Sequence, residues 1–388
     1  MFFSSDRHIT HMDLDTFFVS VEHLRNSKLK GKPILIGGMS DRGVVASCSY
    51  EARKFGIHSG MPMRAARRLC SHAIVIKSDF DAYSKYSKLV TEIIKQEVPL
   101  FEKSSIDEFY IDLSGMDRFF GCKKFSDELK RKVYSESGLP ISYALASNKL
   151  ISKVATNEVK PNGQIEIPFG DEKMFLSPLS IMKIPGIGKE TGYKLLKMGV
   201  ETVKTLSEIP VNLMHNLLGK NGIELHRRSN GIDESPVIPY REQQSISTEH
   251  TFENDTIDTK FLHGELIRMT EKIAYEMRSK NKLTGCIAVK IRYSDFQTEM
   301  KQTSIAYTSA DHVLLKKAKE LFDKLYQRRQ LIRLIGVKFT DLIPGNYQIR
   351  LFEDTQETLN LYQAIDSIKK QYGESFLRRA SGGFVQHL

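Results

Sequence analysis

Apolar and polar residues follow two alternating periods along the first 165 residues. Short apolar runs such as KPILIGG and IVIK have the composition of buried strands. Between them, segments such as DAYSKYSKLVTEIIKQEV place an apolar side chain at every third or fourth position, as on one face of a helix. Strands that alternate with helices in this way predict an α/β domain, in which helices pack on a sheet.

The pattern changes near residue 168, where short helical segments are broken by glycine and proline. The part from SPLSIMKIPGIGK to HRRSNGID predicts a small all-helical domain, and the proline-bearing DESPVIPYREQQ after it is typical of a linker. Residues 244–342 then follow the order strand, helix, strand, strand, helix, strand, which predicts a compact βαββαβ domain. A last amphipathic helix is expected over ETLNLYQAIDSIKKQYG.

Composition indicates the class of protein and the kind of partner. The 388 residues are 40% hydrophobic and 27% charged, contain no apolar run long enough to span a membrane, and include only four well-separated cysteines. We therefore expect a soluble cytoplasmic protein with reduced thiols and no zinc site. The net charge of +10 favours a polyanionic partner. Because acidic residues are interleaved with the basic ones, a basic face is favoured over a disordered arm.

The stretch SSIDEFYIDLSG carries two acids in the middle of a predicted strand. Asp107 and Glu108 are adjacent, and adjacent residues of a regular strand point to opposite faces, so one buried face cannot hide both. An ionised carboxylate is costly in an apolar setting unless it is paired or binds a metal. Either one acid lies at a solvated strand end, or both face a cation. Asp13, at the end of the first predicted strand, is the candidate for a third carboxylate.

Three carboxylates that converge would form a site for Mg²⁺, which prefers hard oxygen ligands. Two such ions, about 3.5–4 Å apart, can clamp the attacking and leaving oxygens of a phosphoryl transfer. The alternative is that these residues are scattered surface acids. Asp15, close to Asp13, is expected to cap the helix that begins with Thr16 rather than to bind a metal.

Five motifs occur in order along the chain: DLDTFF, YEARKFGIHSGMP, SIDEFYIDL, NKLISKVATNEVKPNG and IPGIGK. Over residues 8–342 they resemble the DinB, or polymerase IV, branch of the Y-family DNA polymerases. The resemblance implies a multidomain α/β and α+β right hand, with a ferredoxin-like palm, small fingers, a helix-hairpin-helix thumb and a βαββαβ little finger. The corresponding domains are the palm and fingers (8–166, with the fingers at about 20–77), the thumb (167–233), a linker (234–243), the little finger (244–342) and a tail (343–388).

The resemblance also implies an activity: template-directed addition of dNMPs to a primer 3′ end, with error-prone translesion synthesis and no proofreading. Asp13, Asp107, Glu108 and the backbone carbonyl of Leu14 would hold two Mg²⁺ ions. Phe18 would stack under the deoxyribose and leave no room for a 2′-hydroxyl. The other residues expected to contact the dNTP are Phe17, Ser47, Tyr50, Arg53 and Lys160.

DNA contacts are expected in two domains. In IPGIGK, two glycines at a helix start expose backbone N–H groups to an anion. The resemblance implies that this turn holds a DNA phosphate without reading the sequence. The residues concerned are Pro185, Gly186, Gly188 and Lys189, and on the little-finger sheet Lys290, Arg292, Lys301 and Arg333 are expected to follow the template strand.

The pentapeptide QIRLF, just after the little finger, resembles the motif by which bacterial polymerases bind a sliding clamp. Gln348 and the apolar Leu351 and Phe352 would be its anchors. We expect a monomer whose other partners are primer–template DNA and dNTPs.

Some positions depart from the family pattern. Cys48 and Ser49 stand where relatives usually have alanine and asparagine, and Phe109 is expected to add bulk beside the metal site. Other functions are a two-metal phosphodiester hydrolase, a non-catalytic DNA-binding scaffold, and a UmuC-like polymerase that depends on a partner subunit. The triphosphate residues argue against the first and the three carboxylates against the second, whereas the sequence leaves the third open.

Overall fold

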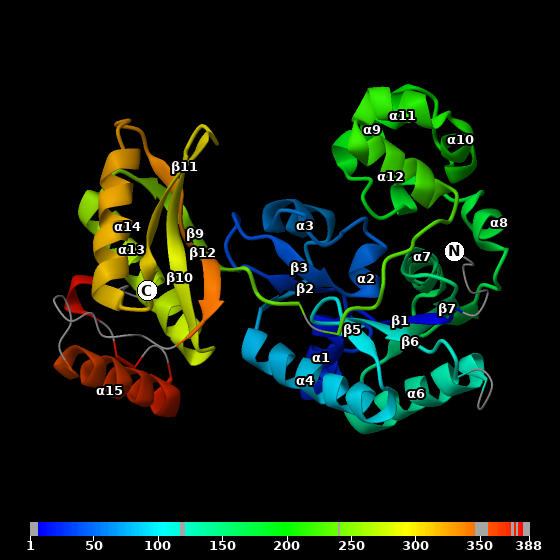
Figure 1. Ribbon diagram of the computed structural model, residues 1–388, viewed down its shortest axis with the longest axis horizontal. Helices are drawn as coiled ribbons and strands as arrows, with labels where there is room; N and C mark the ends of the chain where they lie inside the picture. Colours follow the sequence, from blue (N-terminus) through cyan, green and yellow to red (C-terminus); the bar gives the residue numbers. More distant parts are fainter. Residues whose placement is uncertain are drawn as a thin grey trace. The chain divides into compact units, whose positions relative to one another are not determined.

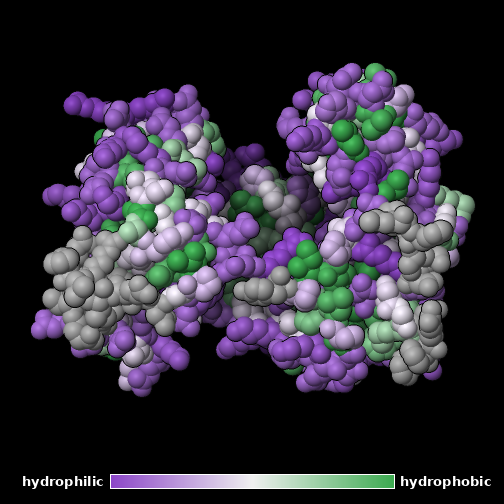
Figure 2. All heavy atoms as spheres, viewed as in Figure 1, coloured by the Kyte–Doolittle hydropathy of each residue, from purple (hydrophilic) through white to green (hydrophobic). Residues whose placement is uncertain are grey.

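The computed structural model describes residues 7–116, 121–239, 241–345, 356–373, 376–377 and 379–382. The chain forms two compact units, Met1–Arg241 and Glu242–Leu388 (Figure 1). Hydrophilic residues cover most of the visible surface of each unit (Figure 2). Within the described ranges, no helix has the length and apolar character needed to cross a membrane. The expected clamp-binding residues, Gln348, Leu351 and Phe352, lie outside these ranges.

A five-stranded sheet and four helices form the centre of the first unit. They are β1 (Ile9–Leu14), β5 (Phe101–Lys103), β6 (Glu108–Asp112), β7 (Ile141–Ala146) and β8 (Gln164–Glu166), with α1 (Phe17–Arg25), α4 (Phe80–Glu97), α6 (Cys122–Ser137) and α7 (Lys149–Val159). The strand order is β5-β6-β1-β7-β8, and β1 is antiparallel to both of its neighbours. Every residue of β1 is buried, as its central place requires.

The two faces of this sheet carry different residues. Met12 and Leu14 of β1 point into an apolar core formed with α1, α4 and α6. Because side chains alternate along a strand, His11 and Asp13 point to the opposite face, where α7 packs against β1 and β7. In Figure 1, α4 and α6 lie below the sheet and α7 lies above it. The face covered by α7 therefore carries the candidate site.

A smaller sheet lies in the same unit. Its elements are β2 (Ile34–Gly37), β3 (Val45–Cys48) and β4 (Ile74–Lys77), with η1 (Ser27–Leu29), α2 (Tyr50–Arg53) and α3 (Met63–Leu69). The strand order is β3-β2-β4. Ser49 caps α2, since its Oγ accepts the N–H of Ala52 at 3.3 Å, and the buried thiol of Cys48 lies 3.6 Å from the carbonyl of Ile57. Both departures from the family pattern therefore take part in the local fold at the start of α2.

The helical segment expected after residue 168 is present. It comprises α8 (Glu172–Leu176), η2 (Ile181–Lys183), α9 (Lys189–Lys197), α10 (Val203–Glu208), α11 (Val211–Leu218) and α12 (Lys220–Ser229). Leu195, Met214 and Leu225 of this segment belong to the same buried cluster as Ile151 and Val154 of α7. The thumb helices and α7 therefore share one core.

The second unit begins with a helix-covered sheet. Its elements are β9 (Ser245–Thr256), α13 (Thr259–Ser279), β10 (Lys282–Tyr293), β11 (Thr298–Thr308), α14 (Asp311–Leu325) and β12 (Ile332–Pro344). The strands pair antiparallel in the order β11-β10-β12-β9, and α13 and α14 share an apolar core with one face of the sheet. The predicted βαββαβ order is confirmed.

The tail of the chain forms α15 (Gln356–Tyr372) and η3 (Ala380–Gly382). Arg278 of α13 joins α15 to the rest of this unit, because it donates to Asp311 of α14 at 2.5 Å and to both carboxylate oxygens of Asp366 at 2.7 and 2.8 Å. The ring of Tyr362, which is 5% exposed, lies 5.4 Å from the guanidinium carbon of Arg278. The amphipathic tail helix therefore docks on the body of its own unit.

Two expectations about single residues are wrong. Thr16 is the N-cap of α1, but no side chain caps the helix. Asp15 instead accepts hydrogen bonds from Ser142 Oγ at 2.9 Å and from the N–H of Asn162 at 2.7 Å. Phe109 is fully buried in the core on the α1, α4 and α6 face, so it adds no bulk beside the carboxylates.

Replacement of Arg278 by alanine should destabilise the second unit. The Asp311 side chain is 3% exposed, and removal of one partner of a buried ion pair costs roughly 3–5 kcal/mol. Urea unfolding followed by circular dichroism measures this loss. Lys280→Ala is the control, because its surface pair with Glu276 should contribute no more than about 0.5 kcal/mol. Equal losses in the two variants would contradict the role of Arg278 as the anchor of α15.

Candidate active site

The candidate site lies where β1 and β6 meet, on the face of the sheet that α7 covers. Asp13 and Glu108 are directly opposite each other in the antiparallel register, so their side chains point to the same face. Asp107 precedes β6, in a bend, and its carbonyl accepts the N–H of Leu14 at 3.1 Å. The two adjacent acids are therefore compatible with one site, because only Glu108 belongs to the regular strand.

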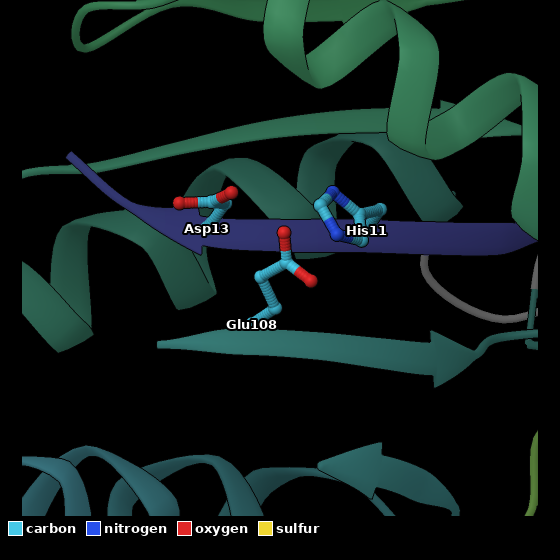
Figure 3. Close-up of side chains that lie close together, drawn as sticks. All are labelled: His11, Asp13 and Glu108. Carbon is cyan, nitrogen blue, oxygen red and sulfur yellow. The ribbon is translucent and has the colours of Figure 1, made fainter. Parts of the chain in front are cut away.

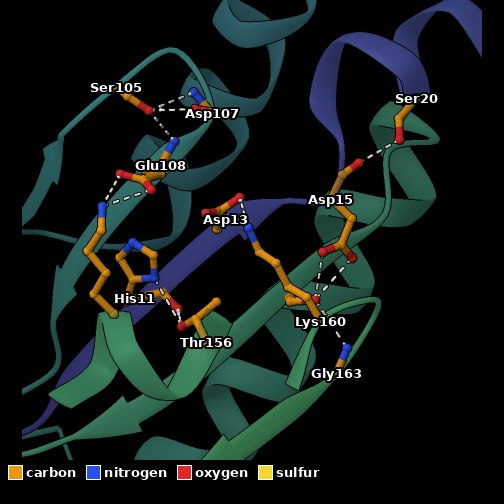
Figure 4. Close-up of polar contacts among 12 residues, drawn as sticks. His11, Asp13, Asp15, Ser20, Ser105, Asp107, Glu108, Thr156, Lys160 and Gly163 are labelled. Carbon is orange, nitrogen blue, oxygen red and sulfur yellow. Dashed lines mark hydrogen bonds and ion pairs between the residues drawn. The ribbon is translucent and has the colours of Figure 1, made fainter. Parts of the chain in front are cut away.

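Each of the two opposed carboxylates binds a lysine (Figure 4). Lys160 Nζ lies 2.6 Å from Asp13 Oδ1, and Lys153 Nζ donates to both oxygens of Glu108 at 2.7 and 2.8 Å. The side chains of Asp13 and Glu108 are 7% and 19% exposed. Carboxylates so far removed from water need positive charge nearby, and here two lysines supply it.

Burial changes the ionisation of Asp13. Removal from water is the largest cause and raises the pKa of Asp13 from 3.8 to about 7; Lys160 opposes this shift, and the charges of Glu108 and Asp107 add to it. Because burial disfavours the ionised form of this carboxyl group, further positive charge nearby would stabilise that form. Further cations would therefore be stabilised here.

His11 completes a cluster that the sequence analysis did not include. One ligand atom from each of His11, Asp13 and Glu108 lies within 4.8 Å of the other two (Figure 3). His11 is fully buried, and burial lowers its pKa well below 6.5, so the ring is neutral. The signal was present in HITHMD, because residues two apart on a strand share a face.

The carboxylate of Asp107 does not join this cluster. Ser105 Oγ donates to it at 2.5 Å and accepts the N–H groups of Asp107 and Glu108 at 3.3 and 3.1 Å, which stabilises the bend before β6. The charge of Asp107 still raises the pKa of Asp13. Of the three carboxylates expected to converge, the structure brings Asp13 and Glu108 together and places Asp107 beside them, bonded to Ser105.

The residues expected at the triphosphate lie on β3 and α2. Ser47 is on β3, and on α2 the guanidinium carbon of Arg53 lies 5.0 Å from the ring centre of Tyr50. The Tyr50 hydroxyl is buried and has no hydrogen-bond partner in the described part of the chain. Burial raises its pKa to about 12, and the charges of Asp15 and Asp13 add to this shift. A buried hydroxyl without a partner fits a ligand that accepts a hydrogen bond from it.

Phe17 and Phe18 occupy different environments. Phe17 is 2% exposed and belongs to the palm core. Phe18 is partly buried and stacks on Tyr83, with ring centres 4.3 Å apart and an interplanar angle of 14°. Phe80 packs edge-on against Phe18 at 5.8 Å. This packing restrains the Phe18 ring, as a steric wall against a substrate group requires.

The IPGIGK turn connects η2 to α9. Gly188 is the N-cap of α9, and Gly186 has a φ of +98°, which favours glycine. Arg228 of α12 donates to the carbonyl of Pro185 at 2.7 Å, and a Cβ on Gly186 would come within 2.8 Å of Arg228 Nη1. A Cβ on Gly188 would meet open space, and Lys189 is exposed beside it. The start of α9 is therefore accessible to a ligand.

The basic residues expected on the little-finger sheet do not share one face. Lys290 and Arg292 alternate with the core residues of β10, so they lie on the face away from the helices. Lys301 is directly opposite Val289, a core residue, and therefore lies on the helix-covered face, at the edge strand β11. A single strand of DNA along the open face would reach the first two and not the third.

Two further positions on β12 extend this description. Arg333 lies at a register shift, with its guanidinium carbon 4.7 Å from the ring centre of Phe296. Lys338, which the sequence analysis did not include, is exposed and directly opposite Ala288, on the same open face as Lys290. Strand alternation alone would have indicated Lys338 once the core face was known.

Helix α7 supplies the polar partners of the site. Lys149, Lys153 and Thr156 follow the spacing i, i+4, i+7, which places them on one face of the helix. Lys153 binds Glu108, and Thr156 Oγ1 lies 3.0 Å from His11 Nδ1. The sequence analysis missed Lys153, although this spacing was visible within NKLISKVATNEVK.

Three parts of the chain match known families: residues 12–157 match the impB/mucB/samB family, residues 243–351 its C-terminal domain, and residues 182–233 the thumb domain of DNA polymerase-iota. The chain is 37% identical to a DNA polymerase IV of Dehalococcoides mccartyi over 375 residues, which cover 96% of each chain. The chain belongs to the Y-family DNA polymerases.

Other members are similar over comparable lengths. The DNA polymerase IV of Desulfatibacillum aliphaticivorans is 32% identical over 380 residues, or 96% of each chain. That of Methanoculleus marisnigri is 34% identical over 346 residues, or 88% of this chain and 96% of the relative. A solved Y-family DNA polymerase chimera is similar in fold, with a TM-score of 0.75 and 25% identity, and covers 87% of this chain and 100% of its own. The Y-family right-hand fold predicted from the sequence is confirmed.

The contribution of Asp13 to the metal-free stability of this Y-family polymerase should fall as the pH rises from about 4 to about 7. Asp13 binds a proton more tightly in the folded state than in the unfolded state, and this advantage is lost as the pH passes the folded pKa. We compare the two proteins in buffer that contains a chelator. The unfolding free energy of Asp13→Asn minus that of the wild type should therefore rise between pH 4 and pH 7, by on the order of 2 kcal/mol.

Urea unfolding at a series of pH values measures this difference. Asp171→Asn, outside the site, is the control and should follow the wild type. Added Mg²⁺ at pH 8 should stabilise the wild type more than Asp13→Asn, because only a protein that binds the ion gains from it. A difference between Asp13→Asn and the wild type that does not change with pH would contradict the shifted ionisation.

Proposed function

We propose that this DNA-directed DNA polymerase adds dNMPs to a primer 3′ end under the direction of a template, by phosphoryl transfer assisted by two divalent metal ions. The observation that carries the proposal is the buried pair Asp13 and Glu108, whose negative charge Lys160 and Lys153 offset only in part. The relatives named DNA polymerase IV support the choice of DNA as product.

We also propose error-prone translesion synthesis without proofreading. The family to which the chain belongs supports the translesion role.

The residues present fit hard divalent ions. Asp13, Asp107, Glu108 and the carbonyl of Leu14 offer the oxygen donors that Mg²⁺ prefers. The raised pKa of Asp13 supports a pocket that favours added positive charge. When bound, such ions stabilise the negative charge that develops on the phosphate oxygens during transfer.

The cationic side chains of the site act on the nucleotide in this proposal. If Asp13 and Glu108 held metal, Lys160 and Lys153 would be released from their present partners, and their ammonium groups would be available to the triphosphate. The other phosphate contacts are made by the Tyr50 hydroxyl, the Arg53 guanidinium and the Ser47 hydroxyl. Tyr50 is the best supported of these, because its hydroxyl is buried and unpartnered.

Phe18 sets the sugar specificity. Its ring is held by stacking on Tyr83, so it does not move aside for a 2′-hydroxyl, and ribonucleotides are rejected by steric exclusion. Because the side chain of Phe17 is buried in the palm core, we propose that its contact with the nucleotide is made by its backbone.

DNA binds at the start of α9 and on the open face of the little-finger sheet. The backbone N–H groups around Gly186 and Gly188, with Lys189, hold a phosphate at a helix N-terminus. Lys290, Arg292 and Lys338 contact the backbone of the template strand without reading its sequence. The clamp contact of Gln348, Leu351 and Phe352, the monomeric state, and the domain boundaries given above are retained as proposals from the sequence.

The first test is primer extension by the purified protein with Mg²⁺ and dNTPs, which should proceed by template-directed addition. Asp107→Ala should slow extension by a factor on the order of 10³, because loss of a metal ligand removes several kcal/mol of transition-state stabilisation. Asp112→Ala, at the far end of β6, is the matched control. Primer shortening would support a hydrolase instead, and DNA that is bound but unchanged would contradict polymerisation.

Phe18→Ala should admit ribonucleotides. Removal of the ring opens space next to the 2′-hydroxyl, so kcat/KM for an rNTP relative to the matching dNTP should rise by about tenfold or more. Phe169→Ala, which removes a 69% exposed ring from the same unit, should leave this ratio unchanged. Single-nucleotide incorporation kinetics measure both. An unchanged ratio in Phe18→Ala would remove this residue from the sugar pocket.

A further inference from the structure

The hydrogen bonds around His11 fix which ring nitrogen carries the proton. Nδ1 of His11 lies 3.0 Å from Thr156 Oγ1, and the same hydroxyl lies 3.1 and 2.8 Å from the carbonyls of His11 and Ser152. A hydroxyl has a single proton and a carbonyl cannot donate, so most contacts are satisfied when Thr156 donates to a carbonyl and accepts a hydrogen bond from Nδ1–H of His11. Nε2 then carries an unprotonated lone pair.

This lone pair has no partner in the described part of the chain, although His11 is fully buried. Figure 4 shows Thr156 on one side of the ring and Glu108 on the other. Since Nδ1 is occupied by Thr156, Nε2 is the nitrogen available to the cluster with Asp13 and Glu108, whose ligand atoms lie within 4.8 Å (Figure 3). A buried polar atom normally has a partner, so an unpartnered one beside two carboxylates indicates a ligand.

We propose that His11 Nε2, Asp13 and Glu108 form a mixed nitrogen–oxygen site that binds a divalent transition-metal ion, with Mn²⁺ preferred over Mg²⁺. Mg²⁺ prefers an all-oxygen environment, whereas imidazole nitrogen is a good ligand for transition metals, and Mn²⁺ accepts carboxylates as well. The inference rests on the proposed function in one respect: Asp13 and Glu108 are metal ligands in the polymerase proposal and in this one.

The ion would compete with two ammonium groups. Lys160 holds Asp13 and Lys153 holds Glu108, whereas His11 Nε2 is bound to neither. The histidine therefore supplies a donor that no lysine has to leave. The orientation of its ring depends on Thr156, which acts on the metal only through His11 and is a positioning residue.

The test is Mn²⁺ binding to the metal-free full-length protein, followed by electron paramagnetic resonance. Bound Mn²⁺ should show coupling to one imidazole ¹⁴N, and Mg²⁺ should displace it only at concentrations about tenfold higher or more. His11→Phe should lose this coupling and weaken Mn²⁺ binding. Thr156→Val keeps the imidazole, so the coupling should persist while affinity falls about tenfold. His215→Gln, which removes an exposed imidazole on α11, is the matched control.

The spectrum of the wild-type protein tests the inference by itself, so the test does not depend on whether any variant folds. Mn²⁺ bound without nitrogen coupling would overturn the inference, and extension of primers by the same protein with Mg²⁺ would leave the proposed function standing. A nitrogen-coupled Mn²⁺ ion in a protein that extends no primer would support the metal site and contradict the polymerase proposal. Coupling that persists in His11→Phe would assign the nitrogen to another residue and overturn the inference.

Discussion

Two carboxylates that face each other across neighbouring strands, largely out of water, are the constraint on which the rest of the palm depends. Asp13 and Glu108 repel each other, and their burial strengthens that repulsion. They persist in this position because positive charge reaches them from outside the sheet, through Lys160 and Lys153. The raised pKa of Asp13 means that this compensation is incomplete, so the pocket remains favourable for more cationic charge.

Helix α7, which carries Lys153, and its C-cap residue Lys160 deliver this charge, and the position of α7 depends on apolar packing. Ile151 and Val154 lie in the core that α7 shares with the thumb helices, while Lys153 and Thr156 reach the site. Packing and electrostatics therefore depend on the same short helix. A change that shifts the apolar face of α7 would also move the cation of Glu108, so the site is sensitive to residues that touch neither metal nor substrate.

The sequence predicted element order well because long helices and alternating strands carry their own period, and it predicted Asp13 and Glu108 because their motifs are local. The error at Asp15 has a different cause: its partners Ser142 and Asn162 are 127 and 147 residues away, and no local pattern contains them. The wrong expectation for Phe109 and the omission of His11 from the site were both avoidable. Strand alternation assigns both to a face, and only the local pattern was needed.

The two lysines offset much of the negative charge of a site that is suited to cations. Two ammonium groups pair with Asp13 and Glu108, and Asp107 adds a third carboxylate beside them, so these five groups together carry only a small negative charge. A triphosphate carries about as much negative charge as two divalent ions carry positive charge, so their joint entry leaves this balance nearly unchanged. The lysines are needed in both states, first for the carboxylates and then for the phosphates. Entry of metal alone or nucleotide alone would disturb the balance, which favours their binding together.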